Sequence, residues 1–370
     1  QSLVKYIKAA LDLKNAGFHL NVDITISSDE ITGLYGPSGS GKSTILRLIA
    51  GLESNLTRNN STSDHQAMIE VSTDQEIWSN ENQFKPAHLR KIGYVFQHPQ
   101  LFPHLSVLGN LQYAIQRKKN STDIELEQVT QWLGIQNLLL KSPTDLSGGE
   151  KQRVSIARVL LSGAEALLMD EPLAALDHQA KHRILPYIDR LHNRLHFPFL
   201  YVSHAMDEIS YLTDYMHILE KGSLTQSGST LELSPSLTVN ENDSCAIVKC
   251  SVESFDENYK LTKLDFENQT IYVAGKRTDK SNIKLNVPAR DVSITLERQT
   301  ASSILNILQG SITNMHSSED GSSILVQIQV GNQYLLSRIT RRSMENLAIK
   351  IGQSIYAQIK SVSLVSEYAD

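Results

Sequence analysis

The chain has 370 residues, enough for two or three domains with a sizeable buried core. Hydrophobic residues make up 40% and charged residues 20%, which is typical of a soluble globular protein, and a net charge of −5 argues against a main role in binding nucleic acid. The two cysteines, Cys245 and Cys250, have no histidine nearby, so they predict neither a zinc site nor a disulfide framework. No apolar run approaches the roughly 18 residues of a membrane span, and we expect membrane association to come through a partner.

The first 30 residues alternate apolar and polar side chains in short runs, which predicts strands. Phe18 is available there to stack on a nucleotide base, although an inward-facing core position is the commoner one for a phenylalanine.

The next segment fits the phosphate-binding pattern G-x-x-x-x-G-K-[ST] at every fixed position. Its nine residues are Gly36, Pro37, Ser38, Gly39, Ser40, Gly41, Lys42, Ser43 and Thr44. Glycines allow successive N–H groups to point at phosphate oxygens, and the following helix presents its positive N-terminus to the same charge. Lys42 can reach the β- and γ-phosphates, while the Ser43 hydroxyl can bind Mg²⁺. A chance Gly/Ser loop is the alternative, and the motifs that follow argue against it.

Residues 54–85 shift to Asn, Ser, Thr, Asp and Gln and predict a β-rich flap with exposed loops. A strand at about 89–96 then leads to Gln97, followed by an apolar, proline-containing loop up to Val107 that is a plausible docking surface for another protein. Residues 123–140 have helical apolar spacing. Beyond them Ser147, Gly148 and Gly149 begin a helix and predict a second anion-accepting helix N-terminus, unless they form an ordinary cap.

Two apolar strands end in groups suited to phosphoryl chemistry. Residues 166–169 lead to Asp170 and Glu171, which we expect to bind Mg²⁺ and to polarise an attacking water. Asp177 then precedes a helix to about residue 195, and residues 199–203 lead to His204. An isolated histidine is more often structural, but this one follows a strand end, where doubly wound sheets bind nucleotides.

In this order the motifs resemble the ATP-binding subunit of ABC transporters over about residues 1–230. The resemblance implies an α/β P-loop NTPase fold, ATP and Mg²⁺ as cofactors, and a head-to-tail homodimer with two ATP molecules between its subunits. It also implies that Ser147, Gly148 and Gly149 of one copy contact the ATP of the other, and that Asp177 links the two sites. Ser43, Asp170 and Gln97 would contact Mg²⁺, and Gln97 and His204 would sense or hold the γ-phosphate, with Glu171, His204 and Lys42 catalytic.

The tail changes to short strands with turns and contains an internal repeat, in which residues 289–294 resemble 359–364 and Asn268-Gln269 corresponds to Asn332-Gln333. We interpret it as an all-β, OB-like region. Short runs at 93–104, 200–204 and 356–362 resemble molybdate importers, and about residues 300–366 resemble a Mop-type domain. That family has Ser-x-Arg-Asn where this chain has Ser303-Ile304-Leu305-Asn306, so oxyanion binding and a purely structural dimerisation role both remain open.

The sequence thus predicts an ABC ATP-binding domain at 1–230, a linker and first small β repeat at 231–299, and a Mop-type domain at 300–370. The resemblance implies a peripheral ATPase on the cytoplasmic face of a bacterial inner membrane, with a permease docked near Gln97–Val107 and, indirectly, a periplasmic oxyanion-binding protein. Molybdate, with tungstate indistinguishable from it, is the expected cargo. The alternatives are an importer of sulfate, ferric iron, a sugar or a polyamine, or a soluble ABC ATPase without transport.

Overall fold

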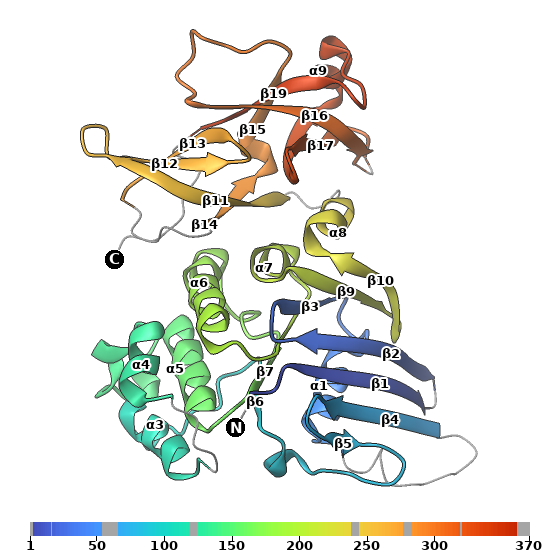
Figure 1. Cartoon of the computed structure of the whole chain (residues 1–370), viewed down its shortest axis with the longest axis vertical. Coiled ribbons are helices and arrows are strands. Elements are labelled where there is room, and N and C mark those ends of the chain that lie inside the picture. Colours follow the sequence, from blue (N-terminus) through green and yellow to red (C-terminus); the bar gives the residue numbers. More distant parts are fainter. Residues whose placement is uncertain are drawn as a thin grey trace. The chain divides into compact units, whose positions relative to one another are not determined.

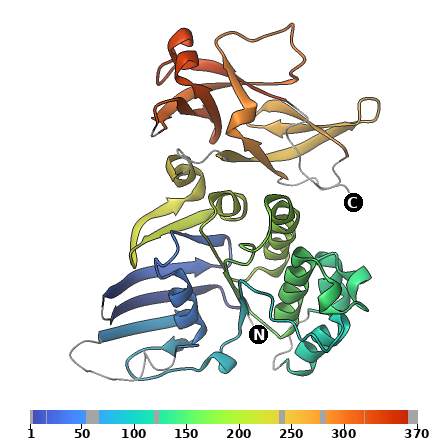
Figure 2. The same cartoon turned by 180° about the vertical axis from the view of Figure 1, so that it is seen from behind.

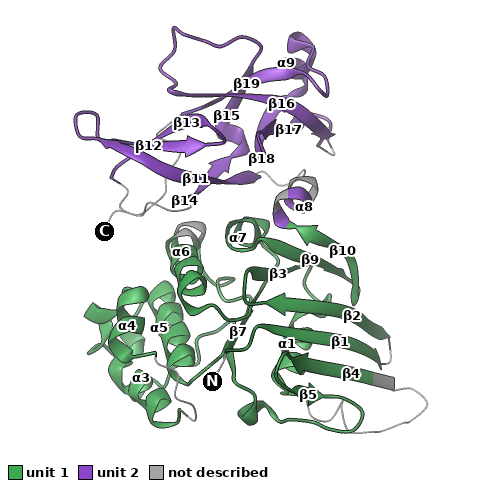
Figure 3. Cartoon of the chain, in the orientation of Figure 1, with its two compact units in different colours: residues 1–229 green, residues 230–370 purple. Residues whose placement is uncertain are grey.

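The computed structural model divides the chain into two compact units, residues 1–229 and 230–370 (Figures 1 and 3). The residues that it describes are 3–15, 17–53, 66–118, 124–237, 244–276, 283–318 and 320–360. Residues 54–65 of the predicted flap and the part of the last predicted repeat segment after residue 360 lie outside these ranges.

The first unit is built on a ten-stranded mixed sheet. Its strands are β1 (Tyr6–Asn15), β2 (Phe18–Ser27), β3 (Ile31–Tyr35), β4 (Gln66–Thr73), β5 (Ile77–Ser79), β6 (Ile92–Val95), β7 (Ala166–Asp170), β8 (Phe199–Ser203), β9 (Tyr215–Glu220) and β10 (Ser223–Ser229). They lie in the order β5-β4-β1-β2-β10-β9-β3-β8-β7-β6. Neighbours among β9, β3, β8, β7 and β6 are parallel, and β7 and β8 are almost continuous apolar runs because both of their faces are covered.

Six helices of the first unit flank this sheet within the described residues. They are α1 (Lys42–Ala50), α3 (Val107–Gln116), α4 (Leu126–Trp132), α5 (Gly148–Leu161), α6 (His178–Leu195) and α7 (Met206–Leu212). Helices α3, α4 and α5 gather on the side of the unit away from β1, β2, β4 and β5 (Figures 1 and 2). Helix α1 buries Ile45, Leu46, Leu48 and Ile49 in a core shared with β2, β7 and β8, so the helix that follows the phosphate loop is firmly seated.

Arg90 lies at the C-terminal end of α1 and binds its last carbonyl groups. Its side chain is 4% exposed, and its Nη1 donates to the carbonyl oxygens of Leu48 and Ile49. Its Nε donates to the Lys85 carbonyl at 2.7 Å. Gly51 leaves room for it, since a Cβ there would lie 2.7 Å from Arg90 Nε, and burial lowers the pKa of Arg90 to about 10. A cation at a helix C-terminus satisfies the last carbonyls and the helix dipole.

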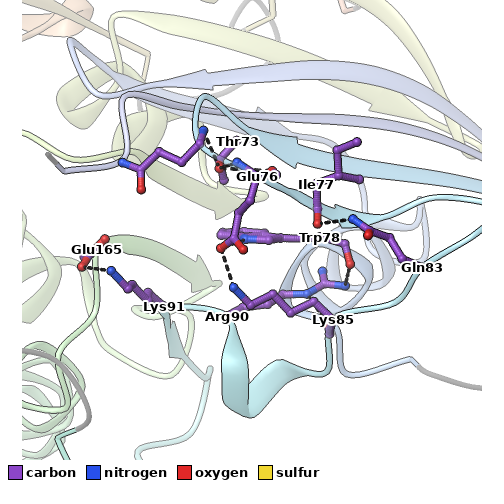
Figure 4. A network of polar contacts seen from close by, with 10 residues as sticks. Thr73, Glu76, Ile77, Trp78, Gln83, Lys85, Arg90, Lys91 and Glu165 are labelled. Atoms are coloured by element: carbon purple, nitrogen blue, oxygen red, sulfur yellow. Dashed lines mark hydrogen bonds and ion pairs between the residues drawn. The ribbon is translucent and has the colours of Figure 1, made fainter. Parts of the chain in front are cut away.

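Two further ion pairs lie near Arg90, one within the segment around β5 and one between the residues that precede β6 and β7. The Glu76 carboxylate accepts hydrogen bonds from Lys85 and from Trp78 Nε1, and Lys91 Nζ lies 2.6 Å from Glu165 Oε1 (Figure 4). Arg90 also lies 5.7 Å from the Trp78 ring centroid. The end of the phosphate-loop helix is therefore tied to the segment that precedes β6.

The second unit contains a four-stranded and a five-stranded antiparallel sheet. Its elements are α8 (Thr230–Leu237), β11 (Cys245–Asp256), β12 (Leu261–Phe266), β13 (Gln269–Ala274), β14 (Ile283–Pro288), β15 (Val292–Thr295), β16 (Asn306–Ser317), β17 (Ser323–Val330), β18 (Gln333–Thr340), α9 (Arg341–Leu347) and β19 (Ser354–Ile359). The orders are β13-β12-β11-β14 and β15-β19-β16-β17-β18, and both sheets contribute to one hydrophobic core. The predicted domain boundary at residue 300 stays a prediction. Strand β15, which precedes residue 300, pairs with β19, which follows it.

The two glutamines of the internal repeat make equivalent contacts. Gln269 donates through Nε2 to the Gln309 carbonyl at 2.9 Å and accepts from the Gln309 N–H at 2.8 Å. Gln333 does the same with the backbone of Lys249, at 2.9 Å and 2.7 Å. Each amide side chain thus pairs with the backbone N–H and C=O of one residue in the other repeat, as a strand residue would.

Candidate functional site

The candidate site lies at the carboxyl ends of the parallel strands of the first unit. There, β3 leads into the phosphate loop, β7 ends at Asp170, and β6 and β8 precede Gln97 and His204. A cleft of about 380 Å³ opens at this edge. It is lined by Phe18, Ser38, Gly39, Gly41, Lys42, Ser43, Thr44, Gln97, Asp170 and Glu171. The topology thus brings together residues from four separate segments of the chain.

The phosphate loop has the backbone that its glycines allow. Gly39 and Gly41 have φ of 80° and 108°, a region that side-chain-bearing residues rarely adopt. Gly36 packs so tightly that a Cβ would lie 2.2 Å from the Leu219 carbonyl oxygen. Gly41 is the N-cap of α1 and provides no side-chain cap, which leaves the first turn of the helix suited to an anion.

Lys42 points into the base of the cleft from the first turn of α1. Its Nζ donates to the carbonyl oxygens of Gly36 at 2.7 Å and Pro37 at 2.9 Å, and lies 3.4 Å from Glu171 Oε1. The side chain is 4% exposed, so its charge is partly removed from water and directed by these oxygens.

Asp170 is held at both carboxylate oxygens. Ser43 Oγ donates to its Oδ1 at 2.9 Å and the Tyr94 hydroxyl donates to its Oδ2 at 2.8 Å. Burial and the Asp170 charge raise the pKa of Tyr94 well above its usual value, so the phenol stays protonated and remains a donor. Sequence reasoning missed this role of Tyr94, although the residue stands in the run Gly93–Gln97 that carried the resemblance.

Glu171 and His204 face each other across the strand ends. Glu171 Oε2 lies 3.0 Å from His204 Nδ1, and the two side chains are 18% and 47% exposed. Glu171 has φ of 45°, the left-handed region that costs energy for a residue with a side chain. This conformation directs the carboxylate towards both Lys42 and His204.

Phe18 and Gln97 form other parts of the lining of the cleft. The Phe18 ring contacts the phosphate loop closely, since a Cβ on Gly41 would lie 2.9 Å from Phe18 Cζ. Its ring therefore lies beside the phosphate loop, and it also packs against the core of the first unit.

Ser147, Gly148, Gly149 and Asp177 do not line this cleft. Ser147 caps α5: its Oγ accepts from the Glu150 N–H at 3.3 Å, and Glu150 accepts from the Ser147 N–H at 2.8 Å. The Ser147 N–H lowers the pKa of Glu150, and Ser147 and Gly148 are exposed. Asp177 Oδ1 caps α6 by accepting from the Ala180 N–H at 2.8 Å.

Comparisons with known proteins agree with this geometry. The profile of the ABC transporter family matches residues 20–174, and that of the TOBE domain matches residues 302–365. Among the parts of the chain that the structure describes, no helix is both long and apolar enough to cross a bilayer.

Curated relatives match over nearly the whole length. The chain is 40% identical to the molybdenum import ATP-binding protein ModC of Methylococcus capsulatus over 97% of this chain and 99% of the relative. It is 41% identical to ModC of Saccharophagus degradans over 94% of each. The solved structure of cbiO1 from Clostridium perfringens, part of an ABC transporter complex, matches with a TM-score of 0.52 and 26% identity over 62% of this chain and 90% of that one. The first unit is an ABC ATPase domain that binds ATP, and the chain belongs to the family of molybdenum import ATP-binding proteins.

Proposed function

We propose that the chain hydrolyses ATP in this cleft and that the reaction drives molybdate uptake through a membrane permease. The observation that carries the proposal is the meeting of Lys42, Asp170 and Glu171 beside the phosphate loop, in a chain that matches molybdenum importers along its length. The identity to those relatives extends over the tail as well as the ATPase unit, which favours molybdate over the other cargoes considered.

The phosphate loop and α1 would bind the nucleotide. The backbone of residues 36–44 would surround the β- and γ-phosphates, and Lys42 would exchange its present oxygen partners for phosphate oxygens. Phe18, which lines the cleft beside Gly41, is suited to contact the base.

The residues around Asp170 fit Mg²⁺. Ser43, Asp170 and Gln97 all offer oxygen atoms, the donors that this hard cation prefers, and a 2.9 Å hydrogen bond joins Ser43 to Asp170. The ion would neutralise charge on the transferred phosphate.

Glu171 and His204 would act on the attacking water. Glu171 accepts a proton as the water oxygen bonds to the γ-phosphorus and the bond from that phosphorus to the β,γ-bridging oxygen breaks, which yields ADP and phosphate. The 3.0 Å contact to His204 orients the Glu171 carboxylate, and Lys42 stabilises the departing charge.

The exposed start of α5 would serve a second copy of the chain. In a head-to-tail homodimer, Ser147, Gly148 and Gly149 would contact the ATP of the partner, and Asp177 would connect the two sites. The exposure of Ser147 and Gly148 supports this role, because these residues begin α5 outside the lining of their own cleft. The segment Gln97–Val107 would dock the permease, which would hold the ATPase on the cytoplasmic face of the inner membrane and work with a periplasmic oxyanion-binding protein.

For the tail we propose a structural, dimer-forming role rather than an oxyanion site at Ser303–Asn306. Leu305, which stands where the Mop-type family has arginine, is 54% exposed and offers no charge to an oxyanion. The Asn306 amide is already used, since it accepts from the Tyr272 N–H at 2.7 Å and donates to the Tyr272 carbonyl at 3.1 Å.

Three measurements test the proposal. Glu171→Gln should keep ATP affinity while it stops steady-state hydrolysis, because a neutral amide cannot accept the proton; hydrolysis at the wild-type rate would refute the role of Glu171. Reconstitution with the permease and an oxyanion-binding protein in vesicles should give ATP-dependent uptake of molybdate or tungstate, and ATP-dependent uptake of sulfate alone would refute the cargo. Calorimetric titration of molybdate, tungstate and sulfate into the chain should show no binding if the tail is structural.

A further inference from the structure

Glu208 is a buried carboxylate outside the cleft lining. It lies in the first turn of α7, four residues after His204, and its side chain is 1% exposed. Isolated buried charges are costly unless they are paired and hydrogen-bonded. A packing role on its own would be met by an apolar residue, as it is at the neighbouring buried position Ile209.

Two hydroxyl donors and one lysine ammonium contact the Glu208 carboxylate. The hydroxyls of Tyr201 and Ser203 donate to its Oε2 at 2.8 Å and 2.9 Å, and Lys181 Nζ lies 2.7 Å from its Oε1. Burial and the charge of Glu208 raise the pKa of Tyr201 well above its usual value, which keeps that phenol a donor. Both hydroxyls belong to β8, the strand that ends directly before His204.

Ser203 transmits this contact to the turn that carries His204. Its hydroxyl donates to Glu208 and at the same time accepts from the Ala205 N–H at 3.0 Å. The peptide group that follows His204 is thus held by a hydroxyl whose rotamer the carboxylate determines.

Lys181 connects the same carboxylate to α6. This lysine is in the first turn of α6, four residues after its N-cap Asp177, and its N–H donates to the Asp177 carbonyl at 3.0 Å. Helix α6 and the His204 turn therefore share a buried ion pair that a displacement of either one would strain.

We propose that Glu208 is a positioning residue for His204 and that, through Lys181, it couples the placement of His204 to the N-terminal end of α6. The inference rests on the proposed function, in which His204 orients the catalytic Glu171. It assigns to Glu208 no contact with ATP.

The test compares Glu208→Gln with wild type in steady-state ATP hydrolysis, nucleotide affinity and thermal unfolding. The amide keeps the size of the side chain but removes the charge that holds Lys181 and Ser203. We expect kcat to fall about tenfold while KM and the affinity for ATP stay within about twofold, because a misplaced His204 affects the chemical step and not ground-state binding. Glu127→Gln, at an exposed position in the first turn of α4, is the matched control and should match wild type.

A double-mutant cycle with His204→Ala separates positioning from general destabilisation. Residual hydrolysis is measured in single turnover with enzyme in excess. If Glu208 acts through His204, Glu208→Gln should change the rate by less than about twofold once His204 is absent. The full tenfold loss in that background, or a change in KM in place of kcat, would overturn the proposal.

Two further variants keep the test decisive. If Glu208→Gln does not fold, Ser203→Ala replaces it in the same cycle, since it removes the link to the Ala205 N–H with a smaller change. Lys181→Gln should also lower kcat if α6 is coupled to His204, and an unchanged kcat would remove that part of the proposal. Wild-type protein without ATPase activity would refute the proposed function instead, whereas active wild type with fully active Glu208→Gln refutes this inference alone.

Discussion

Replacement of Arg90 by methionine should destabilise the first unit by about 3 kcal/mol. The guanidinium makes three hydrogen bonds of 3.0 Å or shorter, to the carbonyls of Leu48, Ile49 and Lys85. Hydrogen bonds to a charged donor contribute about 1.5 to 3 kcal/mol each, and acceptors left unpaired in the interior add to the loss. Methionine carries no charge, so the variant no longer has the desolvation cost of a buried guanidinium, which offsets several kcal/mol of this loss. The net loss is therefore about 3 kcal/mol.

Urea unfolding of the full chain, followed by tryptophan fluorescence, measures this loss. Trp78 lies in the network around Arg90 and is buried, so its emission reports the first unit. Arg90→Lys should lie between wild type and methionine, because an ammonium keeps the charge but cannot reach all the carbonyls. Arg117→Met, at an exposed arginine stacked on Tyr113, should change stability by less than about 0.5 kcal/mol. An Arg90→Met variant within 1 kcal/mol of wild type would show that the carbonyls find other partners and that the reasoning is wrong.

Three further changes probe the cleft itself. Lys42→Ala should lose most of the affinity for ATP as well as turnover, since it removes the charge nearest the proposed phosphate site; unchanged binding of a fluorescent ATP analogue would contradict the phosphate-loop assignment. Tyr94→Phe should weaken Mn²⁺ binding in the presence of ATP by about 10- to 100-fold, measured by electron paramagnetic resonance, and leave metal-free ATP affinity unchanged, because Asp170 loses one of its two supports. Equal Mn²⁺ affinity would show that Ser43 alone orients the carboxylate. Gly36→Ala should lower the melting temperature, because the Cβ would lie 2.2 Å from the Leu219 carbonyl; a melting temperature equal to that of wild type would show that the loop moves aside without cost.

The sequence was enough to predict which strands, loop and helix form the site, because each of these segments has a recognisable local sequence pattern. The buried runs before Asp170 and His204 read as parallel strands, the Gly-rich segment as a loop opening a helix, and the structure has β7, β8 and α1 at these places. The carboxyl ends of parallel strands share one edge, so the convergence of these residues followed from the strand pattern. The OB-like reading of the tail agrees with the TOBE match and the antiparallel sheets.

The polar contacts between distant segments could not be predicted in this way. Arg90 and Leu48 are 42 residues apart, and Tyr94 and Asp170 are 76 apart. Such pairs form where the folded sheet brings two segments together. The local sequence around one partner does not predict which distant residue it will contact. The burial of Glu208 could not be predicted either. A glutamate in the first turn of a helix is ordinarily exposed to solvent, where it interacts favourably with the helix dipole. Its burial here depends on Lys181 from another helix.

The glutamine contacts between the repeats of the second unit have a consequence for how that unit folds. Gln269 and Gln333 each complete a peptide-like pair with the opposite repeat, and the hydrophobic core beneath them is common to both sheets. Opening either repeat would expose part of that core and break all four hydrogen bonds that the two glutamines make between the repeats. Residues 245–359 should therefore unfold in one cooperative transition, and a chain cut between the repeats would yield two fragments that need each other to fold.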